Sequence, residues 1–315
     1  MTTSTTGAPH TFDARTPEDV LAAVPIVLGF VPEESVVMLT FGSEHPFHAR
    51  LDLPDAEADR RAAARALVGP ALRYGVERVL FVLYTDDAEL AAACVTVLVG
   101  TFTGAGIEVV EALRSDGRCW FAVPGEGDPP GATGTPYDVS GHLFTAESVA
   151  SGRVTRASRA ELAATVAADD HACDAVAEAL RALDPEDRLL DGRAVRTVVA
   201  EWAAGLGSPD PVSSARVLGS LREAAVRDAV LTVADRQQAE RELAVWSMLV
   251  RSAPLDLVAP GASVLAFLAW LAGDGALAWC AIERAAEGEP SCSLADRVAE
   301  ALEQALPPSA WEQRR

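Results

Sequence analysis

The 315-residue chain contains no lysine and no asparagine, so arginine supplies all 26 of its basic residues. Without lysine, the chain cannot form a Schiff base, place a lysine on a nucleotide phosphate or build a Ser-x-x-Lys acylation site. Without asparagine, it has no N-glycosylation sequon and no kinase-type catalytic-loop asparagine. These absences exclude several enzyme classes, and they fit a genome rich in G and C, because both missing residues use A-rich codons.

Basic charge as a whole is scarce. The 26 basic residues stand against 46 acidic ones, which leaves a net charge of −20. A protein with this charge repels the phosphate backbone of nucleic acids and the surface of an anionic membrane. We therefore expect no nucleic-acid partner and no membrane partner, and we attribute the acidity to solubility.

Cysteine and histidine are also few. The five cysteines include no CxxC pair, and the closest two, Cys280 and Cys292, are 12 positions apart. This spacing argues against a disulfide framework and against a zinc ribbon, and it favours a reducing cytoplasm. His45 and His48 have H-x-x-H spacing, but without further histidines or cysteines nearby they are a weak metal signal. We expect no metal and no cofactor.

The most informative stretch present spans residues 262–290. Residues 263–272 carry no charge, so a helix there would be apolar on every side and must lie in a protein core or a membrane. Ten residues rise only about 15 Å, whereas a membrane span needs roughly 20 residues, so we expect a core helix. Gly273-Asp274-Gly275 then predicts a turn, and a second helix begins near Ala276.

This second helix completes a predicted helical hairpin. Its polar residues form one narrow stripe, Glu283, Arg284 and Glu287, and nearly all others are apolar. Two adjacent, mostly buried helices need further helices packed over them, which predicts a helical domain.

The first half of the chain has a different pattern. Its segments read in the order strand, strand, helix, strand, helix, strand, strand, which predicts a mixed sheet of about five strands with helices on at least one face. Residues 76–84 form a near-continuous apolar run, as in a strand covered on both faces. We expect Pro25 to end the first helix early, Gly69-Pro70 to disturb the second helix, and residues 125–137 to form a loop.

The pattern changes after Gly152, where every long segment takes a helical period. The sequence therefore predicts an α/β domain over residues 1–155 and an α-helical domain over residues 156–315. Breaks at residues 205–211 and 254–261 divide the helices of the second domain.

The best candidate site lies where the predicted strands end. In open α/β sheets, ligands bind outside the carboxyl ends of the strands. Asp86 and Asp87 follow the third strand, and Arg50 and Asp52 lie near the end of the second. These side chains could bind a divalent cation or carry out acid–base chemistry. Alternatively, Asp86 caps the next helix, while Arg50 and Asp52 form a surface ion pair.

Other catalytic motifs are missing. The chain has no G-x-S-x-G nucleophile elbow, and the glycines of residues 125–134 do not form a dinucleotide-binding G-x-G-x-x-G motif. A Ser–His–Asp triad has no fixed spacing in sequence, so the sequence leaves open a triad assembled by the fold.

Several motifs along the chain belong together. They are Pro25, Leu28-Gly29-Phe30, Pro32 and Ser35; Arg50, Asp52, Leu53 and Pro54; Gly152-Arg153 with Ser158-Arg159; and Trp270, Gly273-Asp274-Gly275-Ala276-Leu277-Ala278, Arg284-Ala285, Pro290, Leu294-Ala295 and Pro307-Pro308. Over nearly the whole chain, this set resembles the actinobacterial domain of unknown function 4192. That family has no assigned activity, so the resemblance implies no catalytic residue.

These observations favour a non-catalytic protein-binding or assembly module in the cytoplasm, with a protein partner or self-association. The alternative is an enzyme, or a small-molecule or metal binder, that uses Arg50, Asp52, Asp86 and Asp87 at the strand ends.

Overall fold

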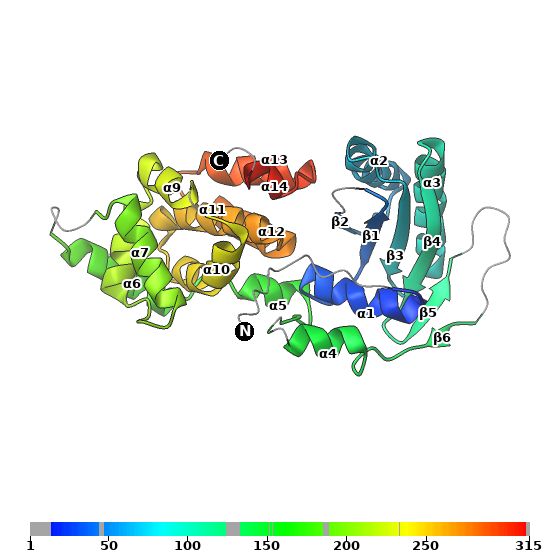
Figure 1. The fold of residues 1–315 in the computed structure, drawn as a ribbon, viewed down its shortest axis with the longest axis horizontal. Helices are drawn as coiled ribbons and strands as arrows, with labels where there is room; N and C mark the ends of the chain where they lie inside the picture. Colours follow the sequence, from blue (N-terminus) through cyan, green and yellow to red (C-terminus); the bar gives the residue numbers. More distant parts are fainter. Residues whose placement is uncertain are drawn as a thin grey trace, which may run out of the picture. The chain divides into compact units, whose positions relative to one another are not determined.

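The structure, a computed structural model, describes residues 14–43, 47–123, 133–150, 152, 154–184, 189–232 and 234–312. The chain divides into two compact units, residues 1–158 and 159–315. The first is an α/β unit and the second contains only helices among its described residues, which is the predicted fold class (Figure 1). His45, of the H-x-x-H pair, lies outside the described residues.

The α/β unit contains a mixed sheet with four helices. Its elements are α1 (Pro17–Leu28), β1 (Ser35–Phe41), β2 (His48–Asp52), α2 (Glu57–Arg73), β3 (Arg78–Tyr84), α3 (Ala88–Gly104), β4 (Glu108–Ser115), β5 (Cys119–Ala122), β6 (Thr135–Pro136) and α4 (Leu143–Ala150). The described strands lie in the order β2-β1-β3-β4-β5-β6. β3 and β4 are parallel, and every other neighbouring pair is antiparallel. The sheet thus has one strand more than the sequence predicts, because β6 falls at the end of the expected loop.

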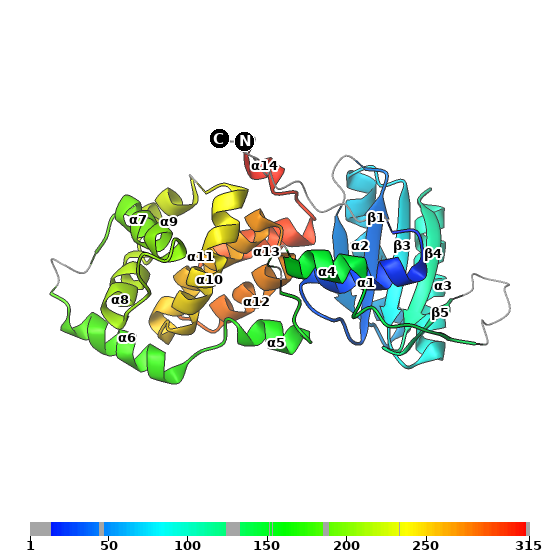
Figure 2. The ribbon, with the colours of Figure 1, turned by 60° about the horizontal axis from the view of Figure 1, so that its bottom comes forward.

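Helices cover both faces of this sheet. α2 and α3 pack on one face, against side chains that include Met38, Phe81 and Leu83. α1 packs on the other face, where Val37, Val82 and their neighbours meet it. Figure 2 shows α1 and α4 across the near face of the sheet, with α2 and α3 behind it. β3 is buried on both faces from its second residue onward, as its continuous apolar sequence predicts.

Two expected helix breaks are absent. α1 continues through Pro25 to Leu28, and α2 continues through Pro70. An internal proline costs a helix about 3 kcal/mol, but burying one large apolar side chain recovers about 1.5–3 kcal/mol. In α1, Leu21 and Val24 are almost completely buried next to the proline, so packing on the sheet outweighs the local cost.

The start of α1 follows the sequence closely. The Thr16 side chain accepts a hydrogen bond from the Asp19 N–H, and the Asp19 carboxylate accepts one from the Thr16 N–H, which completes a capping box. Pro17 occupies the first helical turn, as expected.

The helical unit is organised around one helix. Its elements are α5 (Arg159–Ala164), α6 (Asp170–Ala182), α7 (Gly192–Ala203), α8 (Pro211–Ser220), α9 (Ala224–Leu231), α10 (Arg236–Arg251), α11 (Leu255–Ala272), α12 (Gly275–Ala286), α13 (Ser293–Glu303) and α14 (Ser309–Glu312). α11 packs against α8, α9, α10, α12 and α13. Every residue from Leu257 to Ala272 is buried.

α11 differs from its predicted form in length. It begins at Leu255 and runs through Pro260. Of the break expected at residues 254–261, only Pro254 lies outside the helix, as its N-cap. With 18 residues it is long and apolar enough to cross a membrane, but 89% of its length is buried inside the helical unit. This burial is the one predicted for a core helix.

α11 and α12 form the predicted hairpin. Gly273 takes a left-handed conformation with φ 88°, and the Asp274 side chain accepts a hydrogen bond from the Leu277 N–H at 2.9 Å. The polar stripe on α12 is not uniformly exposed: Arg284 is only 4% exposed and contacts the Glu287 carboxylate. The long aliphatic part of the arginine side chain allows it to lie in the core while its end reaches that carboxylate.

Candidate functional site

The candidate residues gather at one edge of the sheet, which we call the strand-end edge. Here β2, β3 and β4 end and β1 begins, because β1 runs antiparallel to β2 and β3. Ser35 is paired with Asp52 on one side and with Tyr84 on the other, and Tyr84 is paired with Ser115. The topology therefore brings Asp52, at the end of β2, to the same edge as the residues that follow β3.

Arg50 and Asp52 contact each other on β2. An Arg50 Nη1 lies 2.6 Å from an Asp52 carboxylate oxygen, and Arg50 Nε donates a hydrogen bond to Ser35 Oγ at 2.8 Å. The Arg50 side chain is 17% exposed, whereas that of Asp52 is 86% exposed. The pair is thus anchored on the arginine side and open to solvent on the aspartate side, where an ion pair contributes about 0–1 kcal/mol.

Asp86 and Asp87 follow β3. Asp87, rather than Asp86, caps the next helix: its carboxylate accepts a hydrogen bond from the Leu90 N–H at 2.9 Å. The Asp87 N–H in turn donates to Thr85 Oγ1 at 3.2 Å. The Asp86 side chain is exposed, and its backbone carbonyl accepts a hydrogen bond from Arg114.

Sequence reasoning missed several residues at the strand-end edge. The Thr85 hydroxyl donates a hydrogen bond to the Glu34 carboxylate at 3.0 Å. Glu34 has a φ of 38°, rare for a residue with a side chain, and its carbonyl accepts a hydrogen bond from the Leu53 N–H at 2.9 Å. Glu34 therefore joins the start of β1, the end of β2 and the end of β3.

Arg114 is the most unusual of the missed residues. It is only 8% exposed, and its guanidinium carbon lies 3.8 Å from the centre of the Phe121 ring. Its Nη1 donates to the carbonyl oxygens of Thr85 at 3.1 Å and Asp86 at 3.4 Å. No carboxylate oxygen among the described residues lies within 4.0 Å of this guanidinium. Its only signal in the sequence is an arginine close to the end of a strand.

Ser115 and Tyr137 complete the strand-end edge. The two hydroxyl groups lie 2.8 Å apart, and Ser115 is 1% exposed. Burial raises the pKa of Tyr137 above its ordinary value. In the turn that follows β4, backbone N–H groups of Cys119 and Arg118 bind the Asp116 carboxylate and hold its pKa below the ordinary value.

The four predicted side chains fall into two separate pairs. β1 lies between β2 and β3, so two strand spacings, about 10 Å, separate the Arg50–Asp52 pair from the residues that follow β3. Within the described ranges, no group of three or more His, Cys, Asp or Glu side chains could hold a metal ion. The side chains at the strand-end edge are therefore hydrogen-bonded to one another and to the backbone, and they do not surround a common ligand position.

One histidine–aspartate pair has the appearance of a catalytic dyad. His142 Nε2 lies 3.0 Å from an Asp19 carboxylate oxygen, and His142 Nδ1 accepts the Phe144 N–H at 3.2 Å. Because Nδ1 is an acceptor, the neutral ring carries its proton on Nε2 and donates it to Asp19. Neither ring nitrogen is left to take a proton from a serine, so this pair holds the segment before α4 against α1.

Three of the five cysteines, Cys94, Cys173 and Cys280, are poorly suited to nucleophilic chemistry. All five are free, and burial raises the pKa of Cys94 and of Cys280 to about 11. Burial also raises the pKa of Cys173. Since the thiolate is the reactive form, these raised pKa values disfavour nucleophilic chemistry at the three thiols.

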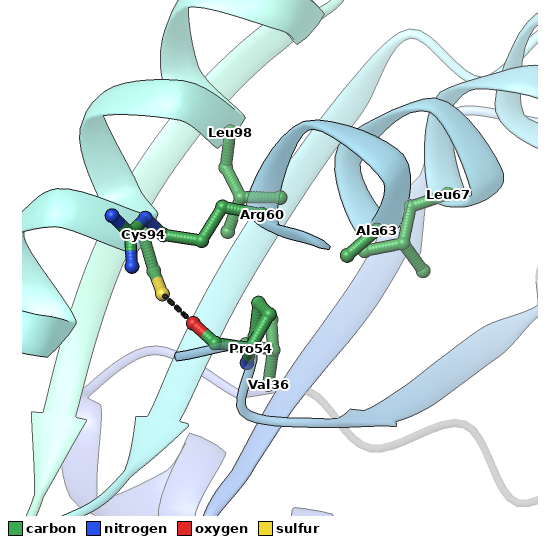
Figure 3. Close-up of a pocket in the computed structure, with 7 residues that line it drawn as sticks. All are labelled: Val36, Pro54, Arg60, Ala63, Leu67, Cys94 and Leu98. Atoms are coloured by element: carbon green, nitrogen blue, oxygen red, sulfur yellow. Dashed lines mark hydrogen bonds between the residues drawn. The ribbon is translucent and has the colours of Figure 1, made fainter. Parts of the chain in front are cut away.

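Among the described residues, two cavities lie away from these side chains. One, of ≈ 10 Å³, has room for about one water molecule, and it is lined by Val36, Pro54, Arg60, Ala63, Leu67, Cys94 and Leu98. Figure 3 shows Arg60 beside Cys94, whose thiol donates to the Pro54 carbonyl at 3.7 Å. The second, of ≈ 250 Å³, belongs to the helical unit and is lined by Leu180, Leu189, Gly219, Arg222 and Glu223. The predicted site residues line neither cavity.

Most of the sequence is matched in a comparison with protein families. A family model described as a domain of unknown function, DUF4192, matches residues 17–309, which is nearly the whole chain. Neither the curated proteins nor the solved structures gave a match.

Proposed function

The chain belongs to the DUF4192 family, whose description names no activity, and we propose that it is a non-catalytic protein-binding or assembly module. One observation carries this proposal. At the edge where an α/β enzyme gathers its reacting groups, four buried polar side chains, Ser35, Thr85, Arg114 and Ser115, are bonded within the chain. The hydroxyl of Tyr84, the last residue of β3, is also buried and has no hydrogen-bond partner among the described residues.

These internal bonds have a chemical consequence. A general base or nucleophile must reach a proton or an electrophile of the substrate within about 3 Å. Here the hydroxyl groups of Thr85 and Ser115 are bonded to Glu34 and Tyr137, and both ring nitrogens of His142 are in use. Such an edge supplies a rigid frame, which suits a surface that recognises another protein.

We further propose that the protein acts in the cytoplasm. The five free cysteines support this, because a reducing compartment keeps thiols in that form.

The proposal is tested by chemical crosslinking of the full-length, tagged chain at its native level, followed by quantitative mass spectrometry. We expect a protein partner, or a second copy of the chain, to be recovered in a constant ratio. An unrelated acidic protein of equal size, carrying the same tag, is the control. A chain that stays monomeric and captures nothing beyond this control would overturn the proposal.

The enzyme or small-molecule alternative has its own test. A metabolite library is screened by thermal shift with the wild-type chain and with Asp52→Asn, Asp86→Asn and Asp87→Ser, which retains a helix cap. Asp59→Asn, on exposed α2 surface, is the matched control. We expect no compound to stabilise the wild type more than the three variants. A compound whose effect survives in the control but disappears in the variants would favour the alternative.

A further inference from the structure

β2 offers an open strand edge. Among the described residues it pairs with β1 alone, and Figure 1 shows it as the outermost strand. The Leu53 N–H donates to the Glu34 carbonyl, and this pair continues the register of Ser35 with Asp52. In an antiparallel ladder, alternate residues turn their backbone groups toward the neighbouring strand. The backbone N–H and C=O groups of Leu51 and Leu53 therefore point toward β1, and those of Arg50 and Asp52 point outward, away from the sheet.

The side chains of β2 are self-complementary. Arg50, Leu51 and Asp52 read as cation, apolar residue, anion, and the same triplet in the opposite direction reads anion, apolar residue, cation. An antiparallel pairing centred on Leu51 thus places each Arg50 opposite the second copy's Asp52. The two Leu51 side chains meet on the axis. Residues directly opposite each other share a face, so the opposite charges come into contact.

The backbone fits the same register. Arg50 and Asp52 both face outward, so each Arg50–Asp52 pair across the axis is of the hydrogen-bonded type, in which the two residues exchange N–H···O bonds. Leu51 falls at the intervening position, where side chains lie closest. A pairing centred on Arg50 instead would place two arginines opposite each other, which is destabilising.

We propose that two copies of this chain associate through β2, in antiparallel register centred on Leu51. The net charge of −20 opposes self-association, so the contact requires a cation, which Arg50 provides. The Asp52 side chain, 86% exposed, is accessible to it. With the Arg50–Asp52 contact inside each copy, the pairing forms a ring of alternating charges across the axis. This inference rests on the proposed function, since it names the partner as a second copy.

Charge reversal tests the pairing. Asp52→Arg places arginines opposite arginines, and Arg50→Asp places aspartates opposite aspartates. By sedimentation equilibrium of the full chain, we expect each variant alone to dimerise at least about tenfold more weakly than the wild type. An equimolar mixture of the two variants restores opposite charges at both positions, and we expect it to form a heterodimer. Mixing cannot repair a contact inside one copy, so recovery identifies a contact between copies.

Asp59→Arg is the matched control, because it makes the same charge change on an exposed residue of α2, outside β2 and outside the strand-end edge. We expect it to dimerise as the wild type does. Melting curves for each variant establish that it is folded. A wild-type chain that remains monomeric, or a mixture that shows no heterodimer, would overturn the inference.

Disulfide trapping gives a second test that does not depend on charge. Leu51→Cys places two thiols across the axis at a non-hydrogen-bonded position, where the Cα atoms lie about 4.5 Å apart, within the roughly 4.4–6.8 Å that a disulfide spans. We expect a covalent dimer on non-reducing gels above the level of the wild type. Ala49→Cys, on the same face of β2, is the control. Its thiol would lie opposite Leu53 of the second copy, so we expect no covalent dimer. Equal trapping by both variants would contradict the register. Loss of self-association with retention of another crosslinked protein would overturn this inference alone and leave the proposed function in place.

Discussion

Each unit is built around one element that is buried on all sides, but the two units treat polar groups differently. β3 fills this role in the α/β unit, and α11 fills it in the helical unit. A helix satisfies its backbone within itself, and the buried polar side chains of the helical unit are spread over several helices; Glu242 on α10, for example, accepts hydrogen bonds from Gln238 and Trp246. A sheet has open ends, and the buried polar residues of the α/β unit concentrate at one of them.

This difference shows where recognition can be sought. In the helical unit, the backbone groups within each helix are hydrogen-bonded to one another and are not available to a partner. In the α/β unit, the strand ends and the outer edge of β2 leave directional backbone groups available. The α/β unit is therefore the part of the chain that we expect to carry binding.

The largest expected effect concerns the core of the sheet. Phe81 on β3 is completely buried and meets the Phe102 ring edge-on, with centroids 5.1 Å apart. Phe81→Ala should lower the free energy of unfolding of the α/β unit by about 3–5 kcal/mol. Hydrogen exchange with mass spectrometry measures each unit separately. Loss of protection in both units together would contradict the division into two compact units.

Leu265 on α11 provides the corresponding change in the helical unit. It is completely buried, and Leu265→Ala should cost about 2–5 kcal/mol there and leave the exchange of β3 unchanged. Leu206→Ala, at a residue 75% exposed, is the control and should change stability by less than about 0.5 kcal/mol. Equal costs for the two leucines would mean that α11 is not the centre of the core.

Arg114 tests whether the strand-end edge depends on its buried cation. Arg114→Ala removes two hydrogen bonds and the contact with Phe121, so we expect the α/β unit to lose about 1–3 kcal/mol. Arg114→Lys keeps the positive charge but lacks the planar guanidinium, so its free energy of unfolding should lie between those of the wild type and Arg114→Ala. Denaturant unfolding gives the free energies, and hydrogen exchange at residues 85–90 locates the change. A neutral Arg114→Ala would show that these bonds do not hold the loop after β3.

The two buried elements were also the most predictable features of the sequence. An uncharged run at residues 263–272 and an apolar run at residues 76–84 are each compatible with few environments, so composition alone indicated burial. Thr16 and Pro17 fixed the start of α1 for a similarly local reason, since helix caps involve neighbours in sequence.

Features that depend on distant neighbours were not predictable. Pro25 and Pro260 lie inside helices because tertiary packing offsets their local cost. The burial of Arg284 could not be predicted from its place in the polar stripe, because spacing along α12 does not reveal which helices cover it. Arg114 went unnoticed because its partners, two carbonyls after β3, are 28 and 29 positions away.

A smaller effect, with a pH dependence, is expected at the start of α1. Backbone N–H groups of Arg15 and Thr16, together with His142, hold the pKa of Asp19 below its ordinary value of 3.8. A lowered pKa in the folded state stabilises the protein above the ordinary value, and this contribution is lost as the pH falls through the folded-state pKa. Asp19→Asn should therefore cost about 1 kcal/mol at neutral pH, and the difference should shrink below pH 3.8.

The measurement is thermal unfolding of wild type and Asp19→Asn across this pH range. His142→Gln keeps a donor to Asp19 without a titrating ring, so it separates the contribution of the histidine. A cost that is constant with pH would show that the carboxylate charge does not matter at this cap.

The smallest effects concern surface ion pairs, one in each unit. Asp52 contacts Arg50 at 2.6 Å, and Glu283 contacts Arg159 at 2.5 Å; the two acidic side chains are 86% and 53% exposed. Because water screens both pairs, Asp52→Ala and Glu283→Ala should each change the free energy of unfolding by less than about 1 kcal/mol, as measured by denaturant unfolding. A larger cost for Asp52→Ala would mean that it supports the fold. If both costs are small, weaker dimerisation after charge reversal at Asp52 reflects the contact between copies rather than unfolding.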